Sequence, residues 1–389
     1  MPTNASYAGI QQLLQAHLGE GISETSLERL VLLVSGIIGA RSAAPARIAK
    51  ALHSLGLVQA KAESLERRVR RIENDPQITS AICLHPLARR RLTLGRPTDL
   101  LLVLDPTSQD ERVVMVSVAV WYRGRALPLA WATWPANTPL EQEGFWERIE
   151  ALLDEVVPLI PVGVSVTCLA DRAFGTPAFT DLLVARGWRY VVRVQDQRRC
   201  RDRMGREWQV RRLVHCRGER RKLAGEVFKG RHWRRGSVLV YWGRRHRSPL
   251  CLVSDWPPVW RLLAVYRRRY GIEASFRDCK SLGWRREQGQ VTALEHVQRL
   301  LVGMATATWV TLAAGTQVAD ELLSRPATGK RRTRPYEGKQ SLFALGLERL
   351  QEVLHGACTV RLSWRFTHWE APNWSQQITA HHAQAYLWA

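Results

Sequence analysis

Three carboxylate residues stand at positions where the chain could hold divalent metal ions. Asp105 ends an apolar run, DLLLVLD, and Asp171 ends a second one, VSVTCLAD. Glu273 follows much later, in a segment with helical spacing. Phosphodiester chemistry needs two hard cations held close together, and carboxylates brought in from separate elements are natural ligands for Mg²⁺. These residues therefore indicate metal-dependent chemistry on nucleic-acid phosphates, although each aspartate alone is most often a cap or turn residue.

A stripe of polar residues accompanies Glu273 on one face of the predicted helix. Its members stand at offsets of 0, 3, 7 and 14 residues: Tyr266, Arg269, Glu273 and Lys280. At about 100° per residue these offsets fall within an arc of roughly 60°. An ordinary solvated face with ion pairs would show the same spacing. The combination with two strand-end aspartates is what favours phosphate binding.

Apolar runs and alternation predict the elements that position these carboxylates. The strand ending at Asp105 precedes a hairpin, RVVMVSVAVWY and ALPLAWATW, with a turn at Arg123 and Gly124. Helices are expected over 141–157 and 177–186, on either side of the strand that ends at Asp171. The segment RYVVRV gives a fifth strand. This βββαβαβ order predicts an α/β protein with both aspartates at one edge of a mixed sheet, and it is the order of the ribonuclease-H-like fold.

The later segments divide the chain into further regions. Residues 196–256 are rich in Arg and Trp and read as a β-rich insertion, after which a helix runs from near Trp260 through Lys280 and another spans 295–314. The N-terminal region is helical, and the stretch from Arg47 to Leu57 fits a helix-turn-helix element or a plain helical bundle. The expected regions are a helical DNA-binding region (1–90), a core in two parts (91–195 and 257–325), the insertion (196–256) and a basic linker with a C-terminal region (326–389).

Charge and composition limit the class of partner. The 389 residues include 57 Lys and Arg against 35 Asp and Glu, a net charge of +22, which favours a polyanionic partner such as nucleic acid. The seven scattered cysteines form no CxxC pair, and His381 and His382 are adjacent on a polar tail, so neither group predicts a metal site. The N-terminus lacks a secretory pattern and the longest apolar stretch is too short to span a bilayer, which predicts a cytoplasmic protein without a membrane partner.

The motif YRRRYGIEASFRDCK resembles a known signature. Its Tyr-(2)-Arg-(3)-Glu-(6)-Lys spacing is similar at every position to that of the DDE transposases of bacterial insertion sequences, in the group numbered four and its relatives. The segment CLADRAFGTPAF resembles the second-aspartate region of that family, where an Arg follows the Asp, here Arg172. LLVLDPT resembles the strand of the first aspartate. The resemblance covers roughly residues 25–315.

The resemblance implies a function for each of these residues. Asp105, Asp171 and Glu273 would be the catalytic residues and would hold two Mg²⁺ ions, with Mn²⁺ as a substitute. Four residues would grip phosphates near the cut: Tyr266, Arg269, Lys280 and Arg172. In some relatives the insertion helps to form a DNA hairpin with a stacked base, and the candidates for stacking are Trp208, Trp233 and Trp242. Buried tryptophans of a small β domain would explain these three equally well.

The implied activity is cut-and-paste transposition. The enzyme would bind double-stranded DNA at the inverted-repeat ends of its element, pair the ends as a homodimer and join them to target DNA. Two alternatives remain at this point. One is a ribonuclease-H-like nuclease or resolvase without strand transfer, and the other is an inactive transposase-derived DNA-binding protein.

Overall fold

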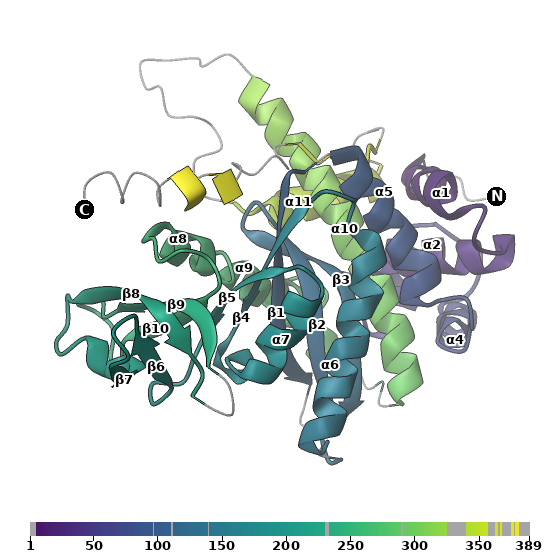
Figure 1. Ribbon diagram of the computed structural model, residues 1–389. Coiled ribbons are helices and arrows are strands. Elements are labelled where there is room, and N and C mark those ends of the chain that lie inside the picture. The colour runs from purple at the N-terminus through teal and green to yellow at the C-terminus, as the bar shows by residue number, and fades with distance from the viewer. Residues whose placement is uncertain are drawn as a thin grey trace.

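One sheet of ten strands forms the centre of the protein in a computed structural model (Figure 1). The strand order is β3-β2-β1-β4-β5-β10-β9-β8-β6-β7. The structure describes residues 5–95, 97–109, 112–138, 140–229, 233–288, 291, 293–324, 340–356, 362–364, 366–367, 375–376 and 378–380. The linker residues 325–339 and the histidines His381 and His382 lie outside this part of the chain.

The first half of the sheet has the predicted order of elements. These elements are β1 (Asp99–Gln109), β2 (Val113–Tyr122), β3 (Arg125–Pro135), α6 (Gln142–Val156), β4 (Ser165–Ala170), α7 (Pro177–Ala185) and β5 (Arg189–Arg193). β1, β2 and β3 form an antiparallel meander, and β4 and β5 run parallel to β1. The turn residues Arg123 and Gly124 both have positive φ, 44° and 84°, as a two-residue hairpin with right-handed strand twist requires.

The insertion extends the same sheet and does not form a sheet of its own. Its strands are β6 (Arg199–Asp202), β7 (Glu207–Gln209), β8 (Arg220–Val227), β9 (Arg234–Tyr241) and β10 (Leu250–Ser254). β10 pairs antiparallel with β5, and β9 pairs antiparallel with β10. In Figure 1 this half of the sheet projects to one side of the helices that surround β1–β3.

The two faces of the sheet pack against different helices. Alternate residues of β1 separate into two clusters, with Leu102 and Leu104 on the side of α6 and α7. Leu101 and Val103 lie in the other cluster, together with residues of α8 (Arg261–Arg267) and α9 (Tyr270–Arg277). Asp105 continues the second series, so the alternation directs its side chain toward α8 and α9.

The predicted single helix from Trp260 through Lys280 is in fact three segments. α8 ends at Arg267, α9 begins at Tyr270, and a π-helix covers Asp278–Leu282. Two contacts fix the segment on the meander. A Cβ atom added to Gly271 would lie 2.9 Å from Cδ1 of Trp121, so only glycine allows this close approach. Arg125 also pairs with Asp278 at 2.6 Å.

A long buried helix, α10 (Leu294–Ser324), joins the sheet to the remaining helices. It is ten residues longer at its C-terminus than predicted. Within the described residues, α10 has the length and composition of a membrane-spanning helix, but 89% of the apolar window of α10 is buried inside the protein. The bent pair α2–α3, counted as one span, has such a length and composition as well. α11 (Leu342–Leu354) packs along it, with Gly315 and Gly346 at a contact that leaves no room for a Cβ atom on either residue.

The N-terminal helices pack around α2 and α10. They are α1 (Ala5–Leu18), α2 (Glu24–Ala40), α3 (Pro45–Ser54), α4 (Ala62–Ile72), a π-helix (Ser80–Leu84) and α5 (His85–Gly95). α2 and α3 meet at 88° across a break of at most four residues. The helix-turn-helix element predicted from Arg47 to Leu57 is mostly the single helix α3, and its turn at Gly56 leads from α3 to α4.

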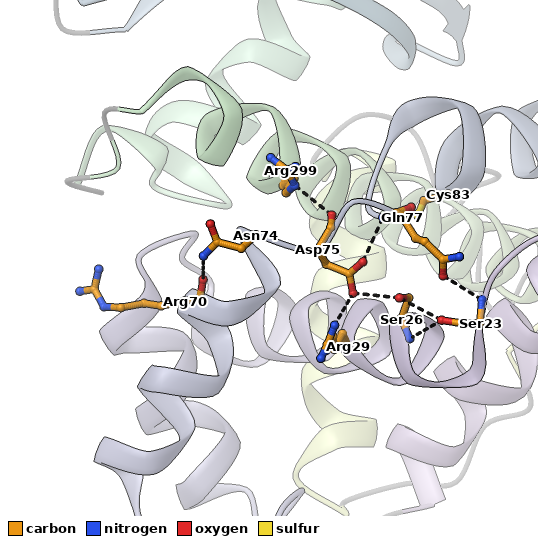
Figure 2. Close-up of polar contacts among 9 residues, drawn as sticks. All are labelled: Ser23, Ser26, Arg29, Arg70, Asn74, Asp75, Gln77, Cys83 and Arg299. Carbon is orange, nitrogen blue, oxygen red and sulfur yellow. Dashed lines mark hydrogen bonds and ion pairs between the residues drawn. The ribbon is translucent and has the colours of Figure 1, made fainter.

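Asp75 joins this bundle to α10 (Figure 2). Its side chain, 1% exposed, accepts hydrogen bonds from Oγ of Ser26 at 2.9 Å and from Arg29 at 2.8 Å. Its carbonyl accepts from Nε of Arg299 on α10 at 2.9 Å. Burial alone would raise the pKa of Asp75, but the hydrogen bonds from Arg29, from the Gln77 backbone and from Ser26 outweigh it and lower the pKa. A charged Asp75 therefore stabilises the junction.

We expect Asp75→Asn to lower the free energy of unfolding by about 2 kcal/mol, because Arg29 and Ser26 lose a charged acceptor. The folded pKa lies below the unfolded value of about 4, so the contribution is complete above pH 4 and is lost as the pH falls through the folded pKa. Urea denaturation at pH 7 and at pH 3 measures the difference. Glu66→Gln, which breaks the exposed pair with Arg70, is the control and should cost less than about 0.5 kcal/mol. Equal losses in the two variants would contradict the role of Asp75.

Candidate active site

Parallel pairing of β1 with β4 brings the two aspartates to neighbouring positions. Leu104 pairs with Ala170, and Asp105 and Asp171 are the next residues along the two chains. Asp171 follows β4 directly and caps the short helix 172–174, accepting a hydrogen bond from the backbone N–H of Arg172. Both aspartates thus lie at the carboxyl edge of the parallel strands.

Glu273 approaches this edge from α9, one turn after Arg269. The guanidinium of Arg269 donates to Oδ2 of Asp105 at 2.9 Å and also donates to Oε1 of Glu273. The side chain of Arg269 is only 7% exposed, whereas that of Glu273 is 48% exposed. The structure therefore brings a strand carboxylate and a helix carboxylate together through one buried cation.

The carboxylates influence one another electrostatically. The pKa of Asp105 is raised to about 6, with burial as the largest cause. Arg269 lowers this pKa, whereas the negative charges of Asp171 and Glu273 also raise it. Burial alone would lower the pKa of Arg269, but the nearby Tyr266, Asp105, Glu273 and Asp171 raise it, so the guanidinium stays charged. The charges of Asp171 and Glu273 thus act on Asp105, and all three carboxylates act on Arg269.

The donor set suits a divalent metal, although the side chains are not arranged around one. Carboxylate oxygens are the ligands that Mg²⁺ and Mn²⁺ prefer. Within the described residues, no group of three His, Cys, Asp or Glu side chains stands at coordinating distance. The guanidinium of Arg269 takes the position between Asp105 and Glu273 where a metal would need their oxygens. The three carboxylates are of the right chemical type for a divalent metal, but the guanidinium of Arg269 already lies between Asp105 and Glu273.

The other predicted phosphate-binding residues differ in how accessible they are near this centre. Lys280 donates to the carbonyl of Ser108 on β1 at 2.9 Å, close to the strand that bears Asp105. Arg172 is exposed beside Asp171. Tyr266, in contrast, is only 1% exposed and packs in the cluster between the sheet and α8. Lys280 and Arg172 are accessible to a phosphate, whereas the ring of Tyr266 helps to seat α8.

The three candidate tryptophans lie at different places in the insertion. β9 runs parallel to β5, so Trp242, which follows β9, lies at the same edge of the sheet as Asp171. Trp233 precedes β9 and therefore lies toward the opposite edge, with Arg201 4.9 Å from its ring. Trp208 is on β7, the outermost strand. Trp242 is half-buried, and its Nε1 donates to the carbonyl of His246 at 3.1 Å.

An aromatic residue that the prediction omitted lies beside the site. Tyr270 is 53% exposed, and the guanidinium carbon of Arg269 is 5.2 Å from the centre of its ring. It stands four residues after Tyr266, so helical periodicity alone would have placed it on the same stripe. An exposed ring next to the carboxylates can stack on a nucleic-acid base.

The raised pKa of Asp105 predicts a pH dependence of stability in the protein without metal or DNA. A folded pKa above the unfolded value means that the folded state binds the proton more tightly, so stability falls as the pH rises from about 4 to about 6. The fall is on the order of 3 kcal/mol for a shift of roughly two pH units. Asp105→Asn should lack this component in urea denaturation between pH 4 and pH 7. An unchanged slope in the variant would assign the pH dependence to other groups.

One comparison with known proteins bears on this geometry. Residues 140–310 match the family model described as "Transposase DDE domain". The matched region contains Asp171 and Glu273, whereas Asp105 lies before it. No curated protein matches the chain. The matched domain, together with a mixed α/β fold around a large central sheet, supports a transposase of the DDE family.

Proposed function

We propose that the protein is a cut-and-paste DNA transposase that binds the inverted-repeat ends of its insertion sequence. It would cleave DNA at those ends and join them to target DNA, acting as a homodimer on double-stranded DNA. The observation that carries the proposal is the position of Asp105, Asp171 and Glu273 at one edge of the sheet, two of them within a transposase domain. The order and direction of β1–β5 support a ribonuclease-H-like core.

The residues of the site would have different roles in phosphodiester chemistry. Asp105, Asp171 and Glu273 would hold two Mg²⁺ ions, which supply an activated oxygen nucleophile and stabilise the leaving oxygen. Lys280 and Arg172 would bind phosphates on either side of the cut. Burial of Asp105 under α9 excludes water from one side of the centre, which strengthens each of these electrostatic contacts.

The N-terminal helices would supply recognition of the DNA ends. The exposed residues of α3 include Arg47, Lys50 and His53, and α4 exposes four arginines: Arg67, Arg68, Arg70 and Arg71. The basic side chains of α3 and α4, on either side of the turn at Gly56, would contact DNA phosphates. The insertion, with Trp242, would supply a further contact with the DNA.

Glu273→Gln is expected to lower cleavage and strand transfer by at least about a hundredfold, because a metal ligand loses its charge. The substrate is DNA carrying the inverted repeats that flank the gene, with Mg²⁺, and the products are separated on gels. Glu150→Gln on α6 is the matched control, since its exposure of 53% is similar to the 48% of Glu273.

The products distinguish the proposed function from its rivals. Joined DNA molecules in the wild-type reaction support transposition, whereas cut ends without joining would identify a nuclease or resolvase. If wild type and Glu273→Gln both bind the ends and neither cuts with Mg²⁺ or Mn²⁺, the protein is a DNA-binding protein without catalytic activity.

A second test concerns α3. The double variant Arg47→Ala, Lys50→Ala should bind end DNA roughly tenfold more weakly, and the slope of log affinity against log salt should fall by about 2 if both residues contact phosphates. Fluorescence anisotropy with end DNA and with a scrambled duplex measures both quantities. Unchanged affinity for both duplexes would exclude α3 from the DNA interface.

A further inference from the structure

Arg269 occupies the carboxylate centre in the protein without DNA. Each of its two terminal nitrogens donates to a different carboxylate, one to Asp105 and one to Glu273. These two residues belong to separate elements, β1 and α9. The arginine therefore neutralises charge and also ties the helix to the strand.

The position of Arg269 excludes a metal ion from the same oxygens. A divalent metal needs oxygen ligands at about 2.0–2.6 Å and is repelled by a guanidinium in that shell. The oxygens Oδ2 of Asp105 and Oε1 of Glu273 are both engaged by Arg269. Asp171 alone of the three is outside this bridge. Metal and arginine therefore compete for these two oxygens.

The resting contacts of Arg269 are incomplete, which makes displacement feasible. Its Nε is buried and has no hydrogen-bond partner among the described residues. The residue stands in the break between the end of α8 at Arg267 and the start of α9 at Tyr270. A DNA phosphate could accept two parallel hydrogen bonds from the guanidinium and satisfy this donor as well.

We propose that Arg269 closes the carboxylate centre to metal in the DNA-free protein and opens it when a DNA phosphate takes over the guanidinium. The inference rests on the proposed function, in which Asp105 and Glu273 are metal ligands. Arg269 is then a positioning residue with two alternating partners, the carboxylates and the phosphate. Metal binding becomes coupled to DNA binding, and by thermodynamic reciprocity bound metal tightens DNA binding by the same factor.

The test measures binding of Mn²⁺ alone to the full chain, by the loss of the electron paramagnetic resonance signal of free Mn²⁺. Without DNA, Arg269→Ala should bind Mn²⁺ at least about tenfold more tightly than wild type, the change expected from removing one charge-assisted competitor. With end DNA present, wild type should gain affinity for Mn²⁺ and Arg269→Ala should gain less.

Two further variants make the result specific. Arg267→Ala removes the same charge from an exposed position two residues away and should leave Mn²⁺ affinity near the wild-type value. Asp105→Asn in the Arg269→Ala background should abolish the added affinity, because it removes the ligand that Arg269 had covered. If Arg269→Ala does not fold, Arg269→Lys carries the test, since lysine keeps a charge but lacks the fork that bridges both carboxylates. Its affinity for Mn²⁺ should exceed that of wild type.

The outcomes separate this inference from the proposed function. Equal or weaker Mn²⁺ binding by both Arg269 variants, with normal binding by wild type on DNA, would overturn the competition and leave the transposase proposal intact. If Arg267→Ala also binds Mn²⁺ more tightly than wild type, the effect comes from general charge, and the competition by Arg269 is again overturned. If no variant binds Mn²⁺ with or without DNA, the carboxylates are not a metal site, and both proposals fail.

Discussion

Two carboxylates on adjacent parallel strands repel each other, and the architecture around them is organised by the need to hold them together. The register of β1 and β4 sets Asp105 beside Asp171, and the alternation along β1 turns Asp105 toward α9. Buried negative charge is costly unless a cation accompanies it. Arg269 is the cation that the protein itself supplies, and its link to Glu273 fixes α9 over the edge of the sheet.

The segment that carries Arg269 depends on contacts made far along the chain. Gly271 permits α9 to lie directly on Trp121, and Arg125 holds Asp278 in the π-helix that follows. Both anchoring residues belong to the β2–β3 hairpin. The meander therefore does more than flank β1, because it determines how closely the helix with Glu273 approaches Asp105.

Much of the half of the sheet that carries the aspartates was predictable, because its elements are long and their patterns are local. The apolar runs before Asp105 and Asp171 are strands, and the hairpin at Arg123 and Gly124 has a clear turn pair. The predicted end of the first strand at Asp105 was wrong, because β1 continues to Gln109 in its pairing with β2. The break between α8 and α9 was not predictable, since helical spacing continues through it and only packing on the meander reveals it. The bridge made by Arg269 was also missed. Periodicity places its side chain on the correct face, but the choice between phosphate and carboxylate depends on partners distant in the sequence.

The close contact between α10 and α11 decides what a shortened chain would expose. All the catalytic candidates precede residue 281, yet the apolar surface of α10 is covered by a helix that begins at Leu342. Gly315 and Gly346 allow the two helices to touch, since a Cβ atom on either residue would meet the backbone of the other helix. A copy shortened by a frameshift after α10 would keep every motif residue and still expose a broad apolar surface, and such surfaces drive aggregation. An intact motif is therefore a poor guide to whether a truncated chain remains folded and free of aggregation.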